Sequence, residues 1–251
     1  MDEIKNTVYQ MFRFWLLLLI VTVTSILMFV TATITFFKAN NVYRLYFVRP
    51  CVWVILKLYG LKVRIHNKEN MSQEQCIYIS NHRSSLDFFS LGTLGLKNTG
   101  YFISDLNKKY WPLRLIGICI GFFFIPHQGF PKERTLCFKE VEKVIRKTGD
   151  SVFLTPEGHK QPRYRLEKFN RGAFHMAANL KIPISPFYIH VPEQVNMGKG
   201  MQAKSGVIDI FFLKTIPTID WEVKNVDKYK TDVHKIFLDF ENNINETVSK
   251  L

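Results

Sequence analysis

The pattern of hydrophobic and polar residues divides the chain into an apolar N-terminal part and a mixed remainder. The segment from Phe14 to Phe37 contains no charged residue, and it is long enough for the roughly 20 apolar residues that a membrane-spanning helix requires. A second apolar segment, Leu45 to Tyr59, is interrupted by Arg49 and Lys57, which is typical of a helix at the membrane interface. Together the two segments predict a membrane-associated helical hairpin that anchors the chain through residues 1–60.

Other interpretations fit the first segment as well. It can cross the bilayer or, paired with the second segment, dip into one leaflet, and the core helix of a soluble protein would also be long and apolar. The segment is too long for the apolar core of a signal peptide and lacks a clear small-residue cleavage site. We therefore expect it to stay in the mature chain and to insert into a membrane.

From Leu61 onward the pattern predicts a soluble α/β domain over residues 61–251. Short apolar runs suited to buried strands alternate with amphipathic runs suited to helices, which favours a mostly parallel central sheet flanked by helices. Strands are expected at 62–66, 76–80, 101–104, 151–154, 182–189 and 207–213, and helices at 84–91, 132–147, 170–180 and 226–251. The last helix is amphipathic and fits either the sheet or a membrane. The apolar run 116–125 fits either a buried strand or a membrane-contacting surface.

Charge narrows the choice of partners. The formal net charge is +13, which favours anionic partners such as nucleic acid or lipid headgroups. The chain has neither a zinc-finger pattern nor an aromatic–basic RNA-binding signature, so we expect membrane lipids and no nucleic acid. Its four cysteines are widely spaced, without a Cys-x-x-Cys pair, and they predict reduced thiols in a cytosol-facing protein.

Basic residues also predict an orientation in the membrane. Lys5 and Arg13 precede the first apolar segment, whereas a larger set follows it: Lys38, Arg44, Arg49, Lys57, Lys62 and Arg64. Because the cytoplasmic flanks of membrane helices carry the excess of Lys and Arg, the α/β domain is expected on the cytoplasmic side of a membrane.

A candidate catalytic pair follows the predicted strand 76–80. In the stretch Asn81-His82-Arg83-Ser84-Ser85-Leu86-Asp87, His82 lies at a strand's carboxyl end, where open α/β sheets place their chemistry. If the turn folds back, Asp87 reaches the imidazole, fixes its tautomer and leaves the other ring nitrogen as a base. A structural His–Asp pair is the alternative. No side chain is placed as in a nucleophile elbow, which suggests that the nucleophile belongs to the substrate.

Three further motifs follow in order: Pro156-Glu157-Gly158, then Phe169-Asn170-Arg171-Gly172-Ala173-Phe174, then Ile182-Pro183-Ile184-Ser185-Pro186. With the His-x4-Asp pattern, this order resembles the glycerolipid acyltransferases, the family of lysophosphatidic acid acyltransferases. The resemblance covers the chain from about Cys76 to Thr218. It implies transfer of a fatty acyl group from acyl-CoA or an acyl-carrier protein to a lysophospholipid hydroxyl. The implied product is phosphatidic acid, made from 1-acyl-sn-glycerol-3-phosphate.

The resemblance also implies residue roles. His82 would be the general base, oriented by Asp87, and backbone amides near Gly158 would bind the tetrahedral oxyanion. The candidate substrate-binding residues are Arg134, Glu157, Gly158, Lys160, Arg171 and a lysine before Pro112, either Lys108 or Lys109. The acyl donor is a co-substrate, and neither a cofactor nor a metal is expected, because the histidines show no ligand spacing with cysteines or carboxylates.

This chain departs from the family pattern at two basic positions. It has His127 where the family has an arginine that holds phosphate, and Arg134 is the nearest replacement. It has His159-Lys160 after Gly158, where the family continues Thr-Arg, and lysine lacks the bidentate fork of arginine. Two alternatives follow: an acyltransferase for another lysolipid, such as a lyso-aminolipid, or an inactive relative that binds anionic lipid. The intact His82 and Asp87 favour an active enzyme.

Overall fold

The computed structural model describes residues 2–158, 166–195 and 204–249. The chain folds into two compact units. The first unit comprises Met1–Arg64, Ser85–Arg134 and His190–Asp209, and the second comprises Ile65–Ser84, Thr135–Ile189 and Ile210–Leu251. The boundary expected from the sequence, between an anchor at 1–60 and a catalytic domain at 61–251, stays a prediction.

The sheet confirms the α/β class. Its strands are β1 (Leu61–His66), β2 (Ile77–Ser80), β3 (Thr99–Ser104), β4 (Phe122–Ile125), β5 (Ser151–Leu154), β6 (Ile184–His190) and β7 (Gly206–Phe212). Over the described residues they form one seven-stranded sheet in the order β1-β7-β6-β2-β5-β3-β4. β2 pairs in parallel with both β5 and β6, and β3 pairs in parallel with β4. The expected strands are therefore present, and the sheet is mostly parallel.

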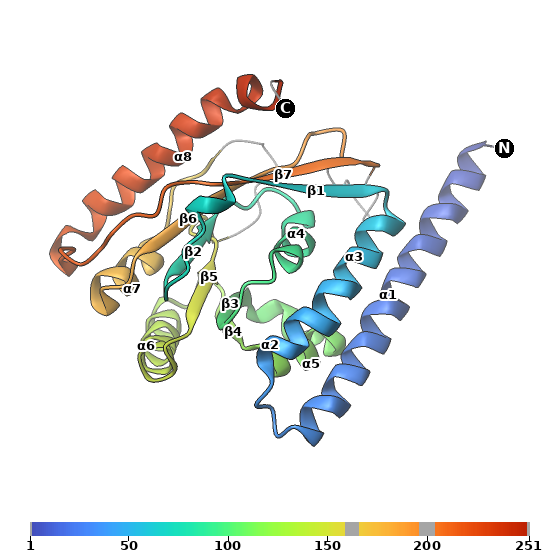
Figure 1. Ribbon diagram of the computed structural model, residues 1–251, viewed down its shortest axis with the longest axis horizontal. Coiled ribbons are helices and arrows are strands. Elements are labelled where there is room, and N and C mark those ends of the chain that lie inside the picture. Colours follow the sequence, from blue (N-terminus) through green and yellow to red (C-terminus); the bar gives the residue numbers. More distant parts are fainter. Residues whose placement is uncertain (1, 159–165, 196–203, 250–251) are drawn as a thin grey trace. The chain divides into compact units, whose positions relative to one another are not determined.

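Helices flank these strands (Figure 1). The helices are α1 (Asp2–Ile34), α2 (Asn40–Tyr43), α3 (Arg49–Leu58), α4 (Leu86–Leu94), α5 (Trp111–Ile120), α6 (Pro131–Thr148), α7 (Gly172–Leu180) and α8 (Val226–Ser249). Short helical turns lie at Lys68–Asn70, Asp105–Lys109 and Val223–Asn225. The helices expected at 84–91, 132–147, 170–180 and 226–251 correspond to α4, α6, α7 and α8.

The first unit corrects the expected N-terminal hairpin. It contains one long apolar helix, α1, in which residues Thr7–Ile34 are long and apolar enough to cross a membrane by length and composition. The expected second segment, Leu45 to Tyr59, is formed by a π-helical stretch at Arg44–Val48 and by α3. α3 buries one face, which includes Cys51, Val52 and Ile55. It is therefore a packing helix of this unit.

A buried arginine begins the π-helical stretch between α2 and α3. The guanidinium of Arg44 donates to the backbone carbonyls of Thr99 at 2.7 Å and Ile120 at 2.6 Å. It also donates to the side-chain oxygen of Asn41 at 2.9 Å. Arg44 is one of the basic residues on which the predicted membrane orientation rests. In the structure its guanidinium binds backbone carbonyls inside the first unit.

The apolar run 116–125, expected to form one strand or one membrane-contacting surface, is divided between two elements. Its first part completes α5, and its last part forms β4. Gly121 separates them with a φ of +84°, a left-handed conformation that glycine adopts without the steric cost of a Cβ atom. The uniform apolar composition hid this boundary, because buried helices and buried strands both lack polar positions.

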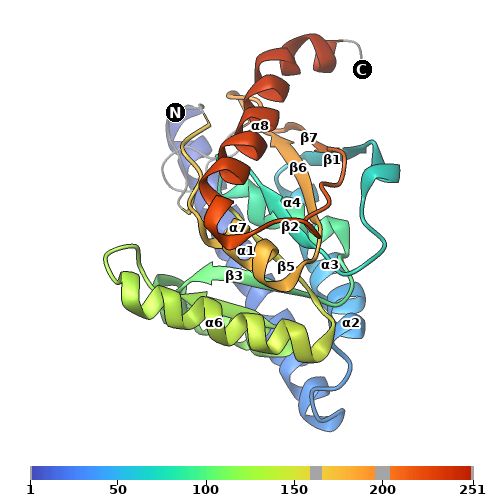
Figure 2. The same ribbon diagram turned by 90° about the vertical axis from the view of Figure 1, so that its left-hand side faces the viewer.

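In the second unit, α8 lies against the sheet (Figures 1 and 2). The ring of Phe240 on α8 lies 5.3 Å from that of Tyr188 on β6 and 5.2 Å from that of Phe211 on β7. Val233 and Phe237 on the same helix are buried. Of the two surfaces expected to receive this amphipathic helix, the structure shows the sheet.

Candidate active site

Two predicted motifs meet at one edge of the sheet in the second unit. β2 ends at Ser80 and leads into Asn81 and His82, and β5 ends at Leu154 and leads into Pro156-Glu157-Gly158. Because β2 and β5 are parallel neighbours, their carboxyl ends lie side by side. The sequence placed both motifs after strands, and the pairing of those strands brings the motifs together.

Asn81 continues the pairing of β2 with β6 beyond the end of the strand. Its side chain donates to the carbonyl of Ile189 at 2.9 Å and accepts from the N–H of Ile189 at 2.7 Å. The asparagine is completely buried. Its amide group therefore takes the place of a strand residue and fixes the backbone on the N-terminal side of His82.

Glu157 holds the backbone of His82 itself. One carboxylate oxygen accepts from the N–H of His82 at 2.7 Å, and the other accepts from the N–H of Glu167 at 3.1 Å. The side chain is 1% exposed. Burial raises the pKa of Glu157, although the two amide hydrogen bonds and the charges of Arg83 and His82 favour its ionised form. In this structure Glu157 positions protein backbone, whereas the sequence predicted that it contacts the acceptor.

Asn170 connects the motif Phe169–Phe174 to the motif Pro156-Glu157-Gly158. Its side chain donates to the carbonyls of Pro156 and Glu157, both at 3.0 Å. Gly158 has a φ of +78°, which suits glycine in this turn, and its N–H donates to the carbonyl of Thr155 at 3.0 Å. The amide of Gly158 is thus engaged in the turn, which weakens the expectation that it binds an oxyanion.

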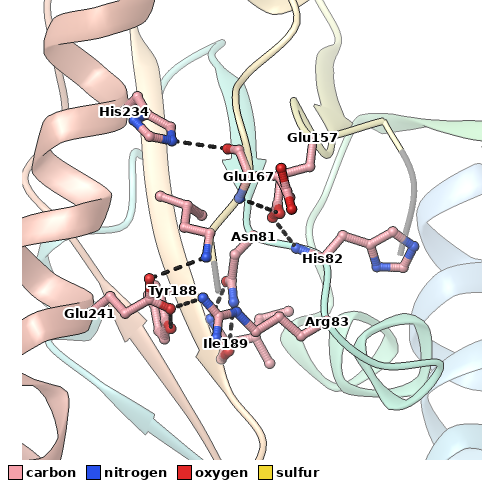
Figure 3. Close-up of polar contacts among 10 residues, drawn as sticks. Asn81, His82, Arg83, Glu157, Glu167, Tyr188, Ile189, His234 and Glu241 are labelled. Carbon is pink, nitrogen blue, oxygen red and sulfur yellow. Dashed lines mark hydrogen bonds and ion pairs between the residues drawn. The ribbon is translucent and has the colours of Figure 1, made fainter. Parts of the chain in front are cut away.

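The C-terminal helix contributes four polar contacts to the same edge (Figure 3). Glu241 on α8 forms an ion pair with Arg83, the residue after His82. Glu241 also accepts from the hydroxyl of Tyr188 at 3.1 Å and from the N–H of Leu166 at 3.2 Å. His234, one of the polar residues earlier on α8, contacts the carbonyl of Glu167 through Nε2 at 2.9 Å. Since a carbonyl can only accept, this nitrogen carries the hydrogen.

Arg171 lies in the second unit, and its side chain pairs with an acidic residue. Its Nε donates to Asp227, at the start of α8, at 2.8 Å, and Nη2 forms an ion pair with the same carboxylate. The guanidinium holds the pKa of Asp227 well below its usual range, with help from Lys230. Both side chains are exposed, so this pair is open to solvent and salt.

Three predicted site residues belong to the first unit. Asp87 lies in the first turn of α4 and is buried. The Nζ atom of Lys108 lies 5.5 Å from the centroid of the Phe124 ring. Arg134, in the first turn of α6, donates through Nη1 to the carbonyl of Pro126 at 2.7 Å. The structure therefore gives Lys108 and Arg134 contacts near the end of β4.

Of the two positions that depart from the family pattern, His127 lies among the residues that the structure describes. The Nδ1 atom of His127 accepts from the N–H of Gly129 at 3.2 Å, so this ring stabilises a turn. Lys160 lies outside the residues that the structure describes. Over the described part of the chain, no group of three or more His, Cys, Asp or Glu side chains is arranged to hold a metal ion.

Sequence reasoning missed the contributions of α8. Asn81 and Asn170 stood inside recognised motifs, and their positions after a strand and before a helix could have suggested a backbone-holding role. Glu241 and His234 carry no such signal, because they sit among other polar residues of an amphipathic helix. Only the packing of α8 on the sheet brings them to the end of the sheet where the motifs lie.

Comparison with known proteins identifies the family. The model of the family described as Acyltransferase matches residues 62–190, a range that contains the His-x4-Asp and Pro-Glu-Gly motifs. The chain is similar to the chloroplastic 1-acyl-sn-glycerol-3-phosphate acyltransferase BAT2 of Brassica napus, with 31% identity over 54% of this chain and 39% of that protein. It is also similar to the 1-acyl-sn-glycerol-3-phosphate acyltransferase of Saccharomyces cerevisiae, with 27% identity over 75% of this chain and 63% of that protein. The chain thus spans less than two thirds of each relative's length.

A solved structure shares the fold. The crystal structure of the 1-acyl-sn-glycerophosphate (LPA) acyltransferase PlsC from Thermotoga maritima matches with a TM-score of 0.73 and 14% sequence identity. The match covers 95% of this chain and 97% of that chain. The ordered motifs, the parallel strands that bring two of them together, and the family match over more than half of the chain lead to one conclusion: this protein belongs to the Acyltransferase family.

Proposed function

We propose that the protein transfers a fatty acyl group from an acyl-CoA or acyl-carrier-protein thioester to the hydroxyl of a lysophospholipid. The acceptor we favour is 1-acyl-sn-glycerol-3-phosphate, which would give phosphatidic acid. The observation that carries this proposal is the backbone of His82, held at the carboxyl end of β2 by the buried carboxylate of Glu157. The relatives named above, which are 1-acyl-sn-glycerol-3-phosphate acyltransferases, support the choice of acceptor.

In the proposed mechanism His82 is the general base. It takes the proton from the acceptor hydroxyl while that oxygen attacks the thioester carbonyl. The tetrahedral intermediate then expels the thiolate, so that a C–O bond replaces the C–S bond and the proton passes from His82 to the departing sulfur. General-base help of this kind contributes about 10²–10⁴ in rate. The role given to Asp87, fixing the tautomer of the imidazole, rests on the His-x4-Asp spacing in the sequence.

The contacts of Glu157 refine the role that the resemblance gave it. Both of its carboxylate oxygens bind backbone N–H groups, which suits a residue that positions His82 more than one that binds the acceptor. Recognition of the acceptor then falls to basic side chains. Arg134 and Arg171 are our candidates, together with Lys108, and Lys160 is a candidate from the sequence.

We also propose that the enzyme works at a membrane, with α1 inserted and the catalytic residues on the cytoplasmic side. Apolar side chains along α1, among them Phe12, Trp15 and Leu19, are more than half exposed. An exposed apolar surface of this kind is costly in water and favourable in lipid. The basic residues after α1 support the orientation, although Arg44 is occupied inside the protein.

The decisive experiment is an acyl-transfer assay with purified full-length protein in detergent. We expect the wild type to acylate 1-acyl-sn-glycerol-3-phosphate, and His82→Ala and Asp87→Ala to reduce kcat by about 10²-fold or more without a change in thermal unfolding. Asp87→Asn should also lose most activity, since an amide cannot stabilise the imidazolium. Full activity in His82→Ala would rule out the assigned base, and no transfer to any lysolipid would leave an inactive lipid-binding protein.

The same assay addresses the headgroup. If the acceptor bears a phosphate, Arg134→Ala or Arg171→Ala should raise KM for the lysophospholipid strongly and KM for the acyl donor little, because one guanidinium can bind phosphate through two hydrogen bonds. Lysolipids without a terminal phosphate, such as a lyso-aminolipid, serve as the comparison. Better turnover of such a lipid by the wild type would replace the proposed acceptor.

A further inference from the structure

Glu241 contacts three separate segments of the second unit, although it lies far along the chain from every sequence motif. Its carboxylate forms an ion pair with Arg83 and accepts from the hydroxyl of Tyr188 and the N–H of Leu166. The side chain is only 17% exposed. A single residue of the C-terminal helix thus joins a motif residue, β6 and Leu166.

Arg83 pairs with this carboxylate in a mostly buried position. Its side chain is 9% exposed, and the guanidinium lies 5.7 Å from the centroid of the Tyr188 ring. Removing one partner of a buried ion pair leaves a charge without compensation, which is strongly unfavourable. Glu241 therefore restrains the side chain of Arg83.

The position of Arg83 in turn restrains His82, because the two residues are adjacent in the chain. Three contacts surround the His82 backbone: Asn81 is bound to β6 on one side, Glu157 accepts from the His82 N–H, and Arg83 is bound to α8 on the other side. Figure 3 shows the imidazole of His82 pointing away from Arg83 and Glu241. Glu241 supplies the restraint on the C-terminal side of the histidine.

We propose that Glu241 is a positioning residue for His82 and acts through Arg83. The inference rests on the proposed function in so far as His82 is the base of acyl transfer. The mechanism needs the imidazole within hydrogen-bond reach of the acceptor hydroxyl, and a displacement of about 1 Å in such a geometry can cost about 10²-fold in rate. A C-terminal helix that carries none of the sequence motifs thereby becomes part of the catalytic apparatus.

The first test compares two carboxylate-to-amide changes on α8 in the full-length protein. Glu241→Gln removes the charge that faces Arg83, whereas Asp239→Asn changes an exposed carboxylate on the same helix. We expect Glu241→Gln to lower kcat by about 10–100-fold with KM for both substrates within about 2-fold. Asp239→Asn should leave both parameters within about 2-fold of the wild type. Wild-type kcat in Glu241→Gln would overturn the proposal.

A second variant separates positioning from simple stabilisation of α8. The double change Arg83→Met and Glu241→Met removes both members of the ion pair, and such apolar replacements of buried pairs are often neutral for stability. We expect its thermal midpoint to lie closer to the wild type than that of Arg83→Met or Glu241→Met alone. Its kcat should stay as low as that of Glu241→Gln, because the restraint on His82 is still missing. Recovery of kcat together with stability would show a purely structural role and overturn the proposal.

A third readout does not need turnover. Amide hydrogen exchange of the peptide that covers residues 77–85 should be faster in Glu241→Gln and in the double variant than in the wild type or Asp239→Asn. If the wild type transfers no acyl group, the proposed function fails, while faster exchange still supports the anchoring by Glu241. If the wild type is active and the Glu241→Gln peptide exchanges at the wild-type rate, the positioning proposal fails and the proposed function stands.

Discussion

The first and last long helices of the chain, α1 and α8, are both rich in apolar residues but expose them to different extents. In α1 the side chains of Trp15 and Leu19 are 64% and 58% exposed. In α8 those of Val233 and Phe237 are 2% and 0% exposed. Apolar residues occur all around α1, whereas α8 carries them at helical spacing on one face. The distribution around the helix, more than the apolar content, indicates what each helix packs against.

The two helices also differ in what their charged residues contact. Arg13 of α1 lies between aromatic rings, 5.3 Å from the ring centroid of Tyr9 and 4.1 Å from that of Tyr59. Both of these aromatic residues belong to the first unit. Glu241 of α8 binds Arg83 in the His82 motif. The comparison therefore separates a helix suited to anchoring from a helix that supports the candidate active site.

The largest expected effect concerns stability on the α8 side. Phe237→Ala removes a completely buried ring and should lower the free energy of unfolding by about 3–5 kcal/mol. The neighbouring change Ile236→Ala, at a 41% exposed position, should change it by about 0.5 kcal/mol or less. Denaturant unfolding of the purified proteins measures both. Equal losses would mean that α8 does not pack through this face.

The next effect concerns the membrane and the α1 side. Leu19→Arg puts a charge on an exposed position of the apolar helix, which costs about 2.5–3.5 kcal/mol at the centre of an inserted helix. We expect carbonate washing to release much of this variant from membranes and to leave the wild type bound. Ile236→Arg on α8 is the matched control and should remain bound. Release of the wild type by carbonate would show that α1 does not insert.

The smallest expected effect concerns Glu157. This residue binds the segment Leu166–Glu167, which α8 also binds. Burial raises the pKa of Glu157 above its ordinary value of 4.5, so the native state holds this proton to higher pH than the unfolded state. The protonated carboxyl thus stabilises the fold fully below about pH 4.5, and this contribution is lost as pH rises through the raised pKa.

Unfolding measured against pH tests this linkage. Above pH 4.5 the free energy of unfolding of the wild type should fall with pH more steeply than that of Glu157→Gln. The difference in slope is at most about 1.4 kcal/mol per pH unit, the value for one proton. Parallel pH profiles would contradict the raised pKa.

The sequence determined the elements of this protein and the family to which it belongs. Strand and helix patterns in the motif region, such as β5 at Ser151–Leu154 and α7 at Gly172–Leu180, matched the structure closely. A short apolar run for a buried strand, or a helical apolar period for a helix, together with glycine and proline at the boundaries, specifies such elements locally. Motif order identified the Acyltransferase family before any contact was known.

Tertiary structure decided what those elements touch. It divided the apolar run 116–125 at Gly121, and it replaced the expected hairpin with the single long helix α1. It turned Glu157 toward the backbone of His82 and brought Glu241 beside Arg83. These contacts join residues far apart in the chain, and local periodicity carries no information about them, because the partner of a polar side chain depends on which elements pack together. The family's motif residues were visible in the sequence, whereas the contact of Glu241 with Arg83 emerged only when α8 packed against the sheet.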